Sequence, residues 1–147
     1  MQYQGDNVKT GIVNCNGKIC NRCRWSVVNK HLKEKLIEIG CVPNKSLILK
    51  FPNLTIFSDK ELVYSFIRGY FDGDGSLFSS GNRIIIKIIG TKEFLTSLNS
   101  IFLSKSIKKD YKTKSNTYSY NIYKRSDVLN FLNLIYKNAN IFLDRKY

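Results

Sequence analysis

Residues 66–76 read Phe-Ile-Arg-Gly-Tyr-Phe-Asp-Gly-Asp-Gly-Ser, and this stretch decides the fold of the chain. An apolar run of helical length leads into two carboxylates, Asp72 and Asp74, which are interleaved with glycines. Ser58, followed three residues later by Glu61, is typical of a capping box that starts a helix. The Gly-Asp-Gly tail is typical of a helix end. The stretch therefore predicts one apolar helix whose end carries carboxylates.

A face without side chains runs along this predicted helix. Gly69 and Gly73 are four residues apart, so they lie on the same side of a helix. Such a face lets a second helix approach to backbone contact. Two copies packed in this way would bring two Asp74 carboxylates together at the end of the pair. Paired carboxylates at adjacent helix ends suit a divalent metal such as Mg²⁺.

Three other interpretations of the two aspartates were weighed. A calcium loop opening at Asp72 would need Gly at its sixth place and Glu at its twelfth, where this chain has Leu77 and Arg83. A hairpin turn at Asp74-Gly75 is disfavoured by the helical run that precedes it. A plain helix end with two solvated aspartates stays open as an alternative.

Residues 67–75, Ile-Arg-Gly-Tyr-Phe-Asp-Gly-Asp-Gly, resemble the nine-residue signature of the LAGLIDADG homing endonucleases. They keep the glycine at its third place and the Asp-x-Asp-Gly ending, whereas Arg68 replaces the usual small residue at the second place. The resemblance extends to 40–46 and Phe51-Pro52 before the signature, and to the endings 135–139 and 143–147. It is looser over the first forty residues.

The resemblance implies an α+β fold built from an αββαββα repeat, with an antiparallel sheet as a DNA-binding saddle. It implies that Asp74 is the direct metal ligand, that the Gly75 carbonyl lies nearby, and that Asp72 has a structural role beside Gly69 and Gly73. It also implies an accessory catalytic lysine, for which Lys45 and Lys146 are the candidates. Mg²⁺ is the expected ion, with Mn²⁺ as a substitute.

Composition agrees with a nucleic-acid partner. The 147 residues include 24 Lys and Arg against 11 Asp and Glu, a formal net charge of +13. A domain this basic attracts polyanions and gains affinity by releasing their counterions. Hydrophobic residues make up 43% of the chain, which is enough for a core, so a disordered basic tail is excluded. The length suits one compact domain.

Strand alternation indicates which residues face double-stranded DNA. In 83–88, the isoleucines at 84, 86 and 88 share one face, which we expect to pack on the helices, while Arg83 and Lys87 share the other. Arg and Lys on a strand can read guanine edges in the major groove, and basic residues of the following hairpin can contact phosphates. In 118–123, Ser119 and Asn121 fall on the polar face. The residues expected to bind DNA are Arg83, Lys87, Lys112, Lys114, Ser119, Asn121 and Lys124.

From residue 62 onward the patterns predict the order α-β-β-α-β-β-α. The first hairpin pairs 76–80 with 83–89, the second runs through 111–123, and Thr91 and Ser126 start the helices that follow. The stripe of the last helix includes Leu129.

The first forty residues repeat the end of this order. Strands are predicted over 8–14 and 20–28 around an Asn16-Gly17 turn, then a helix that Asn29 starts and Gly40 closes. Residues 1–50 are thus interpreted as a partial first repeat with a link, and 51–147 as a complete one. One signature helix is missing, so a homodimer or a second chain supplying the other half is expected.

The four cysteines and the start of the chain bear on metals and compartment. Cys20 and Cys23 have the spacing of half a zinc knuckle, with Cys15 and Cys41 as the remaining ligands. Strand alternation would point the first pair to opposite faces, so a structural zinc is not expected. The polar start lacks the apolar stretch of a signal peptide and no run could span a membrane, so an intracellular protein without a membrane partner is expected.

These observations together predict a sequence-specific, divalent-metal-dependent DNA endonuclease of the homing type that makes double-strand breaks. The single histidine, His31, disfavours a nuclease built on a histidine base. A non-catalytic nucleic-acid binder, either an RNA maturase or a transcription factor, is one alternative, and an inactive remnant of a two-repeat enzyme is another. Retention of Asp74 favours catalysis, whereas the missing front of the first repeat favours the remnant.

Overall fold

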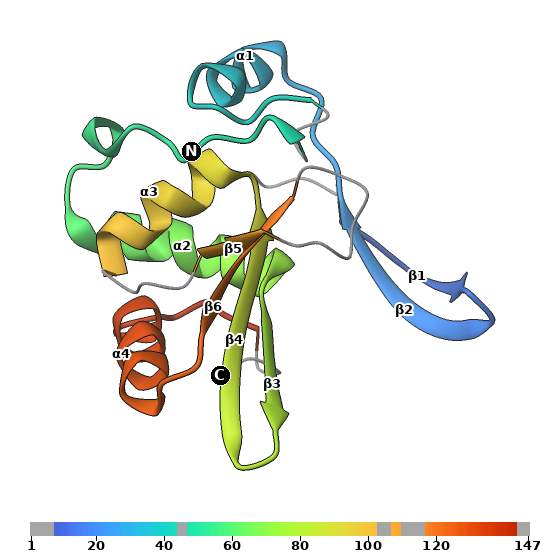
Figure 1. The fold of residues 1–147 in the computed structure, drawn as a ribbon. Coiled ribbons are helices and arrows are strands. Elements are labelled where there is room, and N and C mark those ends of the chain that lie inside the picture. The colour runs from blue at the N-terminus through green and yellow to red at the C-terminus, as the bar shows by residue number, and fades with distance from the viewer. Residues whose placement is uncertain (1–7, 44–46, 103–106, 110–116, 144–147) are drawn as a thin grey trace. The chain divides into compact units, whose positions relative to one another are not determined.

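The computed structural model describes residues 8–43, 47–102, 107–109 and 117–143, and the chain divides into two compact units, Met1–Lys35 and Leu36–Tyr147 (Figure 1). The first unit contains the antiparallel hairpin of β1 (Val8–Cys15) and β2 (Lys18–Trp25). Asn16 and Gly17 form its turn with φ of 53° and 82°. Positive φ at both positions explains why the Asn-Gly pair predicted this hairpin correctly.

Helix α1 (Lys30–Glu38) begins and ends where the sequence predicted. The Asn29 side chain accepts a hydrogen bond from the Leu32 backbone N–H at 2.9 Å, which satisfies one free donor of the first turn. Gly40 follows the helix with φ of 98°, a conformation that favours glycine. A short 3₁₀ turn, η2 (Leu54–Ile56), lies between α1 and the signature helix.

Helix α2 (Lys60–Asp74) contains the signature, and its start corrects one prediction. Asp59, not Ser58, caps the helix by accepting a hydrogen bond from the Leu62 N–H at 2.9 Å. Asp59 has the extended backbone, with φ −155° and ψ 172°, that turns its carboxylate towards the first turn. Ser58 instead donates a hydrogen bond to Asp59, and these hydrogen bonds, led by that from Leu62, lower the pKa of Asp59.

The remaining elements confirm the predicted order from α2 onward, α-β-β-α-β-β-α. The strands form one antiparallel sheet in the order β3-β4-β6-β5. The elements after α2 are β3 (Ser76–Ser80), β4 (Arg83–Gly90), α3 (Lys92–Phe102), β5 (Ile107–Lys109), β6 (Tyr118–Ile122) and α4 (Arg125–Tyr136). The predicted α+β class is therefore correct. No helix in the described ranges combines the length and apolar character that crossing a bilayer requires.

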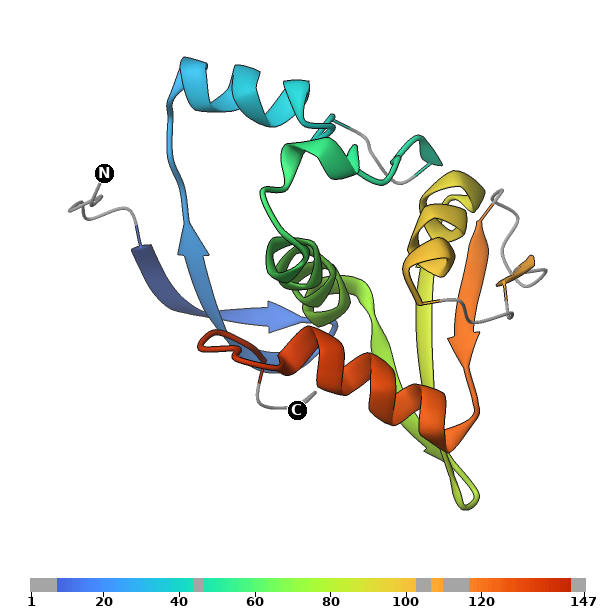
Figure 2. The ribbon, with the colours of Figure 1, turned by 90° about the vertical axis from the view of Figure 1, so that its left-hand side faces the viewer.

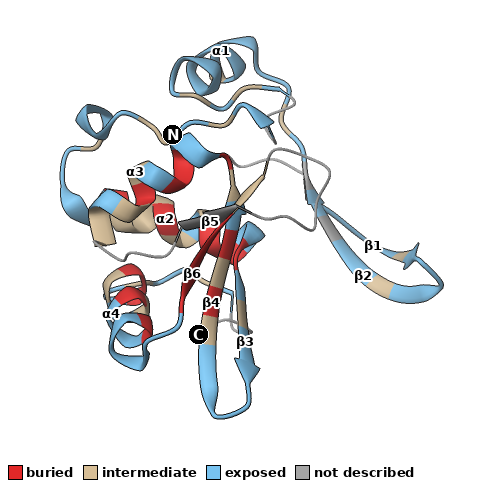
Figure 3. Ribbon diagram, viewed as in Figure 1, coloured by how far each residue is buried: buried red, intermediate tan, exposed pale blue. Residues whose placement is uncertain are grey.

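One face of the sheet carries the core. Ile86 and Ile88 of β4 pair in register with Ile122 and Tyr120 of β6, and all four are almost fully buried. Helices α2 and α4 lie on the same side of these strands in Figure 2, and the buried residues of Figure 3 gather between them. Ile84, predicted to share this face, is 54% exposed, because β6 pairs with β4 only from Ile86 onward.

The sequence predicted the capping residue of α3 correctly but not that of α4. Thr91 caps α3 as predicted, since its hydroxyl accepts from the Phe94 N–H at 3.1 Å. Ser126 does not cap α4. Lys124 occupies that position without a side-chain hydrogen bond, and Ser126 lies inside the first turn. Leu129 is 50% exposed, contrary to the predicted core stripe, and Val128 is buried instead.

Candidate active site at the end of helix α2

The two aspartates of the signature lie in different surroundings because a helix turns about 100° per residue, which places them about 200° apart. Asp72 is buried, with 9% of its surface exposed. Asp74 is the last residue of α2 and is exposed. Of these two aspartates, Asp74 therefore offers the solvent-facing carboxylate at this end of the helix.

Both carboxylate oxygens of Asp72 are engaged within the chain. One accepts a hydrogen bond from the Tyr136 hydroxyl at 2.5 Å, and the other accepts from the Leu143 backbone N–H at 3.1 Å. Burial, followed by the hydrogen bond to Asp72 and its charge, raises the pKa of Tyr136 above its ordinary value. Asp72 therefore fastens the end of α4 and the segment after it onto α2.

Arg68, the departure from the family signature, contacts the same end of α4. Its guanidinium donates to the Ile135 carbonyl at 2.8 Å and to the Ser65 hydroxyl at 3.3 Å. Carbonyls of the last helical turn lack partners within the helix and carry partial negative charge, so a cation there is favourable. The long side chain is thus directed to α4.

The glycine face of α2 is open. Among the residues that the structure describes, a Cβ atom added at Gly69 or Gly73 would meet nothing within 4 Å, and Leu62 beside them is 48% exposed. Gly75 differs, because a Cβ there would lie 2.7 Å from the Phe71 carbonyl oxygen. Glycine at position 75 is therefore required by the tight exit of the chain from α2, whereas the other two leave a free surface.

Tyr70, which the sequence analysis did not single out, lies next to Asp74. Its hydroxyl donates to the Ile89 carbonyl of β4 at 3.1 Å, and its ring stacks on Phe94 at a centroid distance of 4.3 Å. Burial and then the negative charge of Asp74 raise the pKa of Tyr70 to about 12. Its spacing could have indicated this position, because a residue four places before Asp74 lies on the same side of the helix.

This raised pKa predicts how stability depends on pH. An unfolded tyrosine ionises near pH 10, whereas folded Tyr70 stays neutral, so its contribution is complete below about pH 10 and is lost between about pH 10 and 12. Urea unfolding of the parent and of Tyr70→Phe across pH 8–11 should show a steeper loss above pH 10 in the parent. Parallel curves for the two proteins would contradict the burial of a neutral Tyr70.

The residues predicted to contact DNA fall into three groups. Arg83 and Lys124 are exposed, and Lys87 is half-buried. Ser119 and Asn121 are each only 6% exposed, and the Asn121 amide donates to the Ser119 hydroxyl at 2.9 Å. Lys112 and Lys114, together with the candidate catalytic lysines Lys45 and Lys146, lie outside the described residues.

Metal donors are sparse within one chain. Across the part of the chain that the structure describes, no three His, Cys, Asp or Glu side chains come together as a metal-binding group. Cys15, Cys20 and Cys41 are free thiols. The exposed Asp74 carboxylate is an oxygen ligand of the kind that Mg²⁺ prefers, whereas Gly75, whose carbonyl the resemblance places nearby, is buried.

The chain is similar to several known proteins. A family model described as a LAGLIDADG-like domain matches residues 61–136, from the start of α2 to the end of α4. A Methanocaldococcus jannaschii protein, described as a probable translation initiation factor IF-2, is 34% identical over 142 residues, which cover 84% of this chain. The chain spans only 12% of the length of that protein.

Solved structures of three homing endonucleases are also similar. I-SmaMI bound to cleaved DNA aligns with 80% of this chain and 40% of its own, at 18% identity and a TM-score of 0.43. I-TnaI aligns over 56% and 63%, at 18% identity and a TM-score of 0.44. I-CvuI, in complex with its target in the presence of Ca, aligns over 55% and 59%, at 10% identity and a TM-score of 0.42.

Proposed function

This chain belongs to the LAGLIDADG-like domain family, and we propose that it is a sequence-specific, divalent-metal-dependent DNA endonuclease of the homing type that makes double-strand breaks. One observation carries the proposal. Asp74 is exposed at the end of the signature helix, whereas Asp72, two residues before it, is fully used in holding α4. Asp72 therefore has a structural role, whereas the Asp74 carboxylate remains available to bind a metal.

Asp74 and the Gly75 carbonyl would hold the metal. Carboxylate and carbonyl oxygens are ligands of hard cations such as Mg²⁺, and a bound ion of this kind supplies the positive charge that activates water for hydrolysis. The chain fixes these ligands through the Gly75 N–H, which donates to the Phe71 carbonyl at 2.8 Å. Tyr70 supports the same end of α2 by its hydrogen bond to β4.

The sheet face opposite the helices is the proposed DNA surface. Arg83 and Lys87 project from β4 on the side away from the buried Ile86 and Ile88, and the net charge of +13 favours a polyanion. Ser119 shares that face of the sheet but is buried. Direct contacts are therefore assigned mainly to the basic residues, with Lys124 at the end of β6 among them.

Two signature helices are proposed to pair through the open glycine face. One chain provides a single Gly69–Gly73 face and a single Asp74, and the exposed Leu62 beside it is apolar surface that a partner would cover. The partner is a second copy of this chain or a separate segment that carries another signature helix. A twofold pair would bind a roughly palindromic DNA site.

The replacement Gly69→Leu tests this pairing. Position 69 is open within the chain, so the fold should persist, while the new side chain blocks close helix approach. We expect sedimentation to show at least about a tenfold weaker self-association or partner binding, equivalent to about 1.4 kcal/mol.

Asn130→Leu, which adds the same side chain to the exposed surface of α4, is the matched control and should associate as the parent does. Double-strand cleavage by a parent protein that sediments as a monomer would contradict the pairing.

Cleavage assays with and without chelator test the activity itself. With Mg²⁺ the assembled protein should cut a DNA substrate, and with EDTA it should bind that substrate without cutting. Cleavage that is undiminished in EDTA would contradict the metal-dependent function, and binding without any cleavage in Mg²⁺ would identify a non-catalytic binder.

A further inference from the structure

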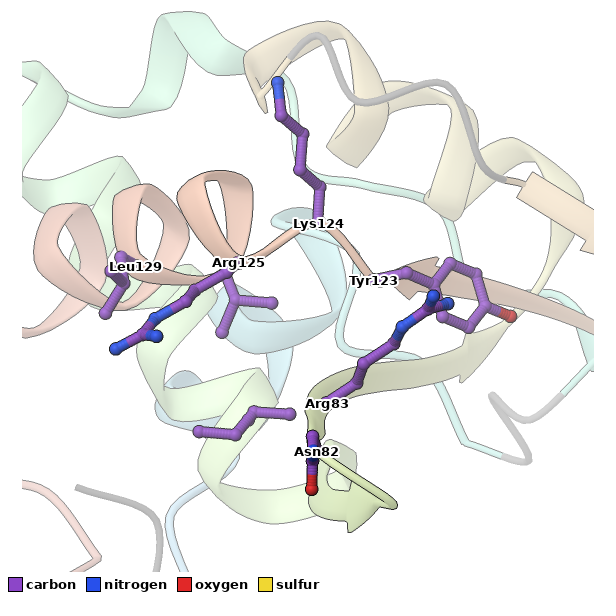
Figure 4. Close-up of a pocket in the computed structure, with 8 residues that line it drawn as sticks. Asn82, Arg83, Tyr123, Lys124, Arg125 and Leu129 are labelled. Carbon is purple, nitrogen blue, oxygen red and sulfur yellow. The ribbon is translucent and has the colours of Figure 1, made fainter.

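A basic cleft lies at the outer end of the sheet, away from Asp74, where β4 begins and β6 leads into α4. It has a volume of about 670 Å³. Figure 4 shows its lining from the β3–β4 turn, from the β6–α4 junction and from the first turns of α4. The lining residues are Asn82, Arg83, Ile84, Tyr123, Lys124, Arg125, Val128 and Leu129.

Two arginines provide the charge of this cleft. Arg83 is the first residue of β4 and Arg125 is the first residue of α4. In Figure 4 the Arg83 side chain extends towards Tyr123 and the Arg125 side chain towards Leu129, while Lys124 extends away from the others. Among the described residues, neither guanidinium forms an ion pair or a hydrogen bond. Both therefore keep their donors available for an anion.

The start of α4 adds to this positive charge. Lys124 occupies the N-cap position without a side-chain cap hydrogen bond, and the positive end of the helix dipole faces the junction. Asp127 is the acidic residue of this first turn, and its carboxylate accepts from the Ser126 hydroxyl at 3.0 Å. Three cations against one carboxylate leave the junction positively charged.

Apolar side chains also line the cleft, and three of them are exposed. Ile84 is 54% exposed, Leu129 50% and Tyr123 42%, whereas Val128 is buried. A site made of bidentate guanidinium donors beside apolar surface matches an alternation of phosphate and deoxyribose. A free inorganic anion would gain no binding energy from the apolar side chains of the cleft.

We infer that this cleft is a DNA-backbone anchor, in which Arg83 and Arg125 bind phosphates while Tyr123 and Leu129, towards which they extend, pack against the neighbouring sugars. The inference rests on the proposed function and adds a site outside the metal end of α2. Because phosphates and sugars are the same at every base pair, the anchor contributes affinity without sequence preference. Arg83, predicted from strand alternation to read base edges, is here assigned to the backbone.

The double variant Arg83→Gln/Arg125→Gln tests the anchor by fluorescence anisotropy on a 30-bp duplex across a NaCl series. Each lost phosphate contact lowers the slope of log affinity against log salt by about 0.9, so we expect a decrease of about 2 and at least about tenfold weaker binding. The loss should be equal on two duplexes of unrelated sequence. Lys92→Gln/Lys137→Gln removes the same charge from exposed positions elsewhere and should change the slope by less than about 0.5.

Leu129→Ser tests the apolar half. An apolar contact releases no counterions, so we expect about threefold weaker binding with an unchanged salt slope.

If the arginine and lysine double variants behave alike while the parent binds DNA, the cleft is not an anchor and the proposed function stands. A loss confined to particular base pairs would also overturn the assignment. A parent protein that binds no duplex DNA would overturn both the anchor and the proposed function.

Discussion

Replacing Asp74 with asparagine is expected to abolish DNA cleavage while leaving the fold and DNA affinity unchanged. Asp74 is exposed and forms no part of the hydrogen-bond network that holds α4, so the replacement removes charge without removing support. An amide binds a divalent ion far more weakly than a carboxylate does, and we expect the cleavage rate to fall by more than about a hundredfold.

Single-turnover cleavage, measured beside anisotropy binding, separates the chemical step from recognition. Glu34→Gln is the control, because Glu34 is an exposed carboxylate in α1, outside both proposed sites, and this variant should cut as the parent does. Cleavage by Asp74→Asn at the parent rate would show that this carboxylate does not hold the metal.

Removing the Asp72 side chain is expected to cause the largest loss of stability. In Asp72→Ala the Tyr136 hydroxyl and the Leu143 N–H both lose their acceptor, and each unsatisfied group costs about 1–3 kcal/mol. We therefore expect the free energy of unfolding to fall by about 2–5 kcal/mol in urea denaturation. Tyr136→Phe removes only one of these hydrogen bonds, and its effect should be smaller.

A double-mutant cycle between Asp72→Ala and Tyr136→Phe isolates their shared hydrogen bond. The two losses should be non-additive by about 0.5–3 kcal/mol, because either change alone breaks the same contact. An Asp72→Ala protein as stable as the parent would contradict the structural role of Asp72.

Much of the fold could be predicted because its core follows simple periods. Ile86 and Ile88 alternate on a strand, and Phe94, Leu95 and Leu98 recur at helical spacing, so burial follows from position alone. These patterns also break where the elements end. Ile84 obeys the period but lies beyond the part of β4 that pairs with β6, and no local pattern encodes where this pairing begins.

The caps and the site show a second limit of sequence reasoning. Ser58 and Asp59 are both good capping residues, and the choice depends on which one has the extended backbone before the helix. Partners of Asp72 lie 64 and 71 residues away along the chain, so its burial becomes visible only in the fold. Alternation likewise assigned Ser119 to the polar face but could not indicate that this position is buried.

The most direct test is to incubate the parent protein with a library of randomised DNA sites and Mg²⁺, and to sequence both strands of the products. We predict double-strand breaks at a restricted, roughly palindromic set of sites, with EDTA and Asp74→Asn each abolishing them. If the protein binds particular DNA sites but leaves both strands without a nick or break, the proposed endonuclease function is contradicted.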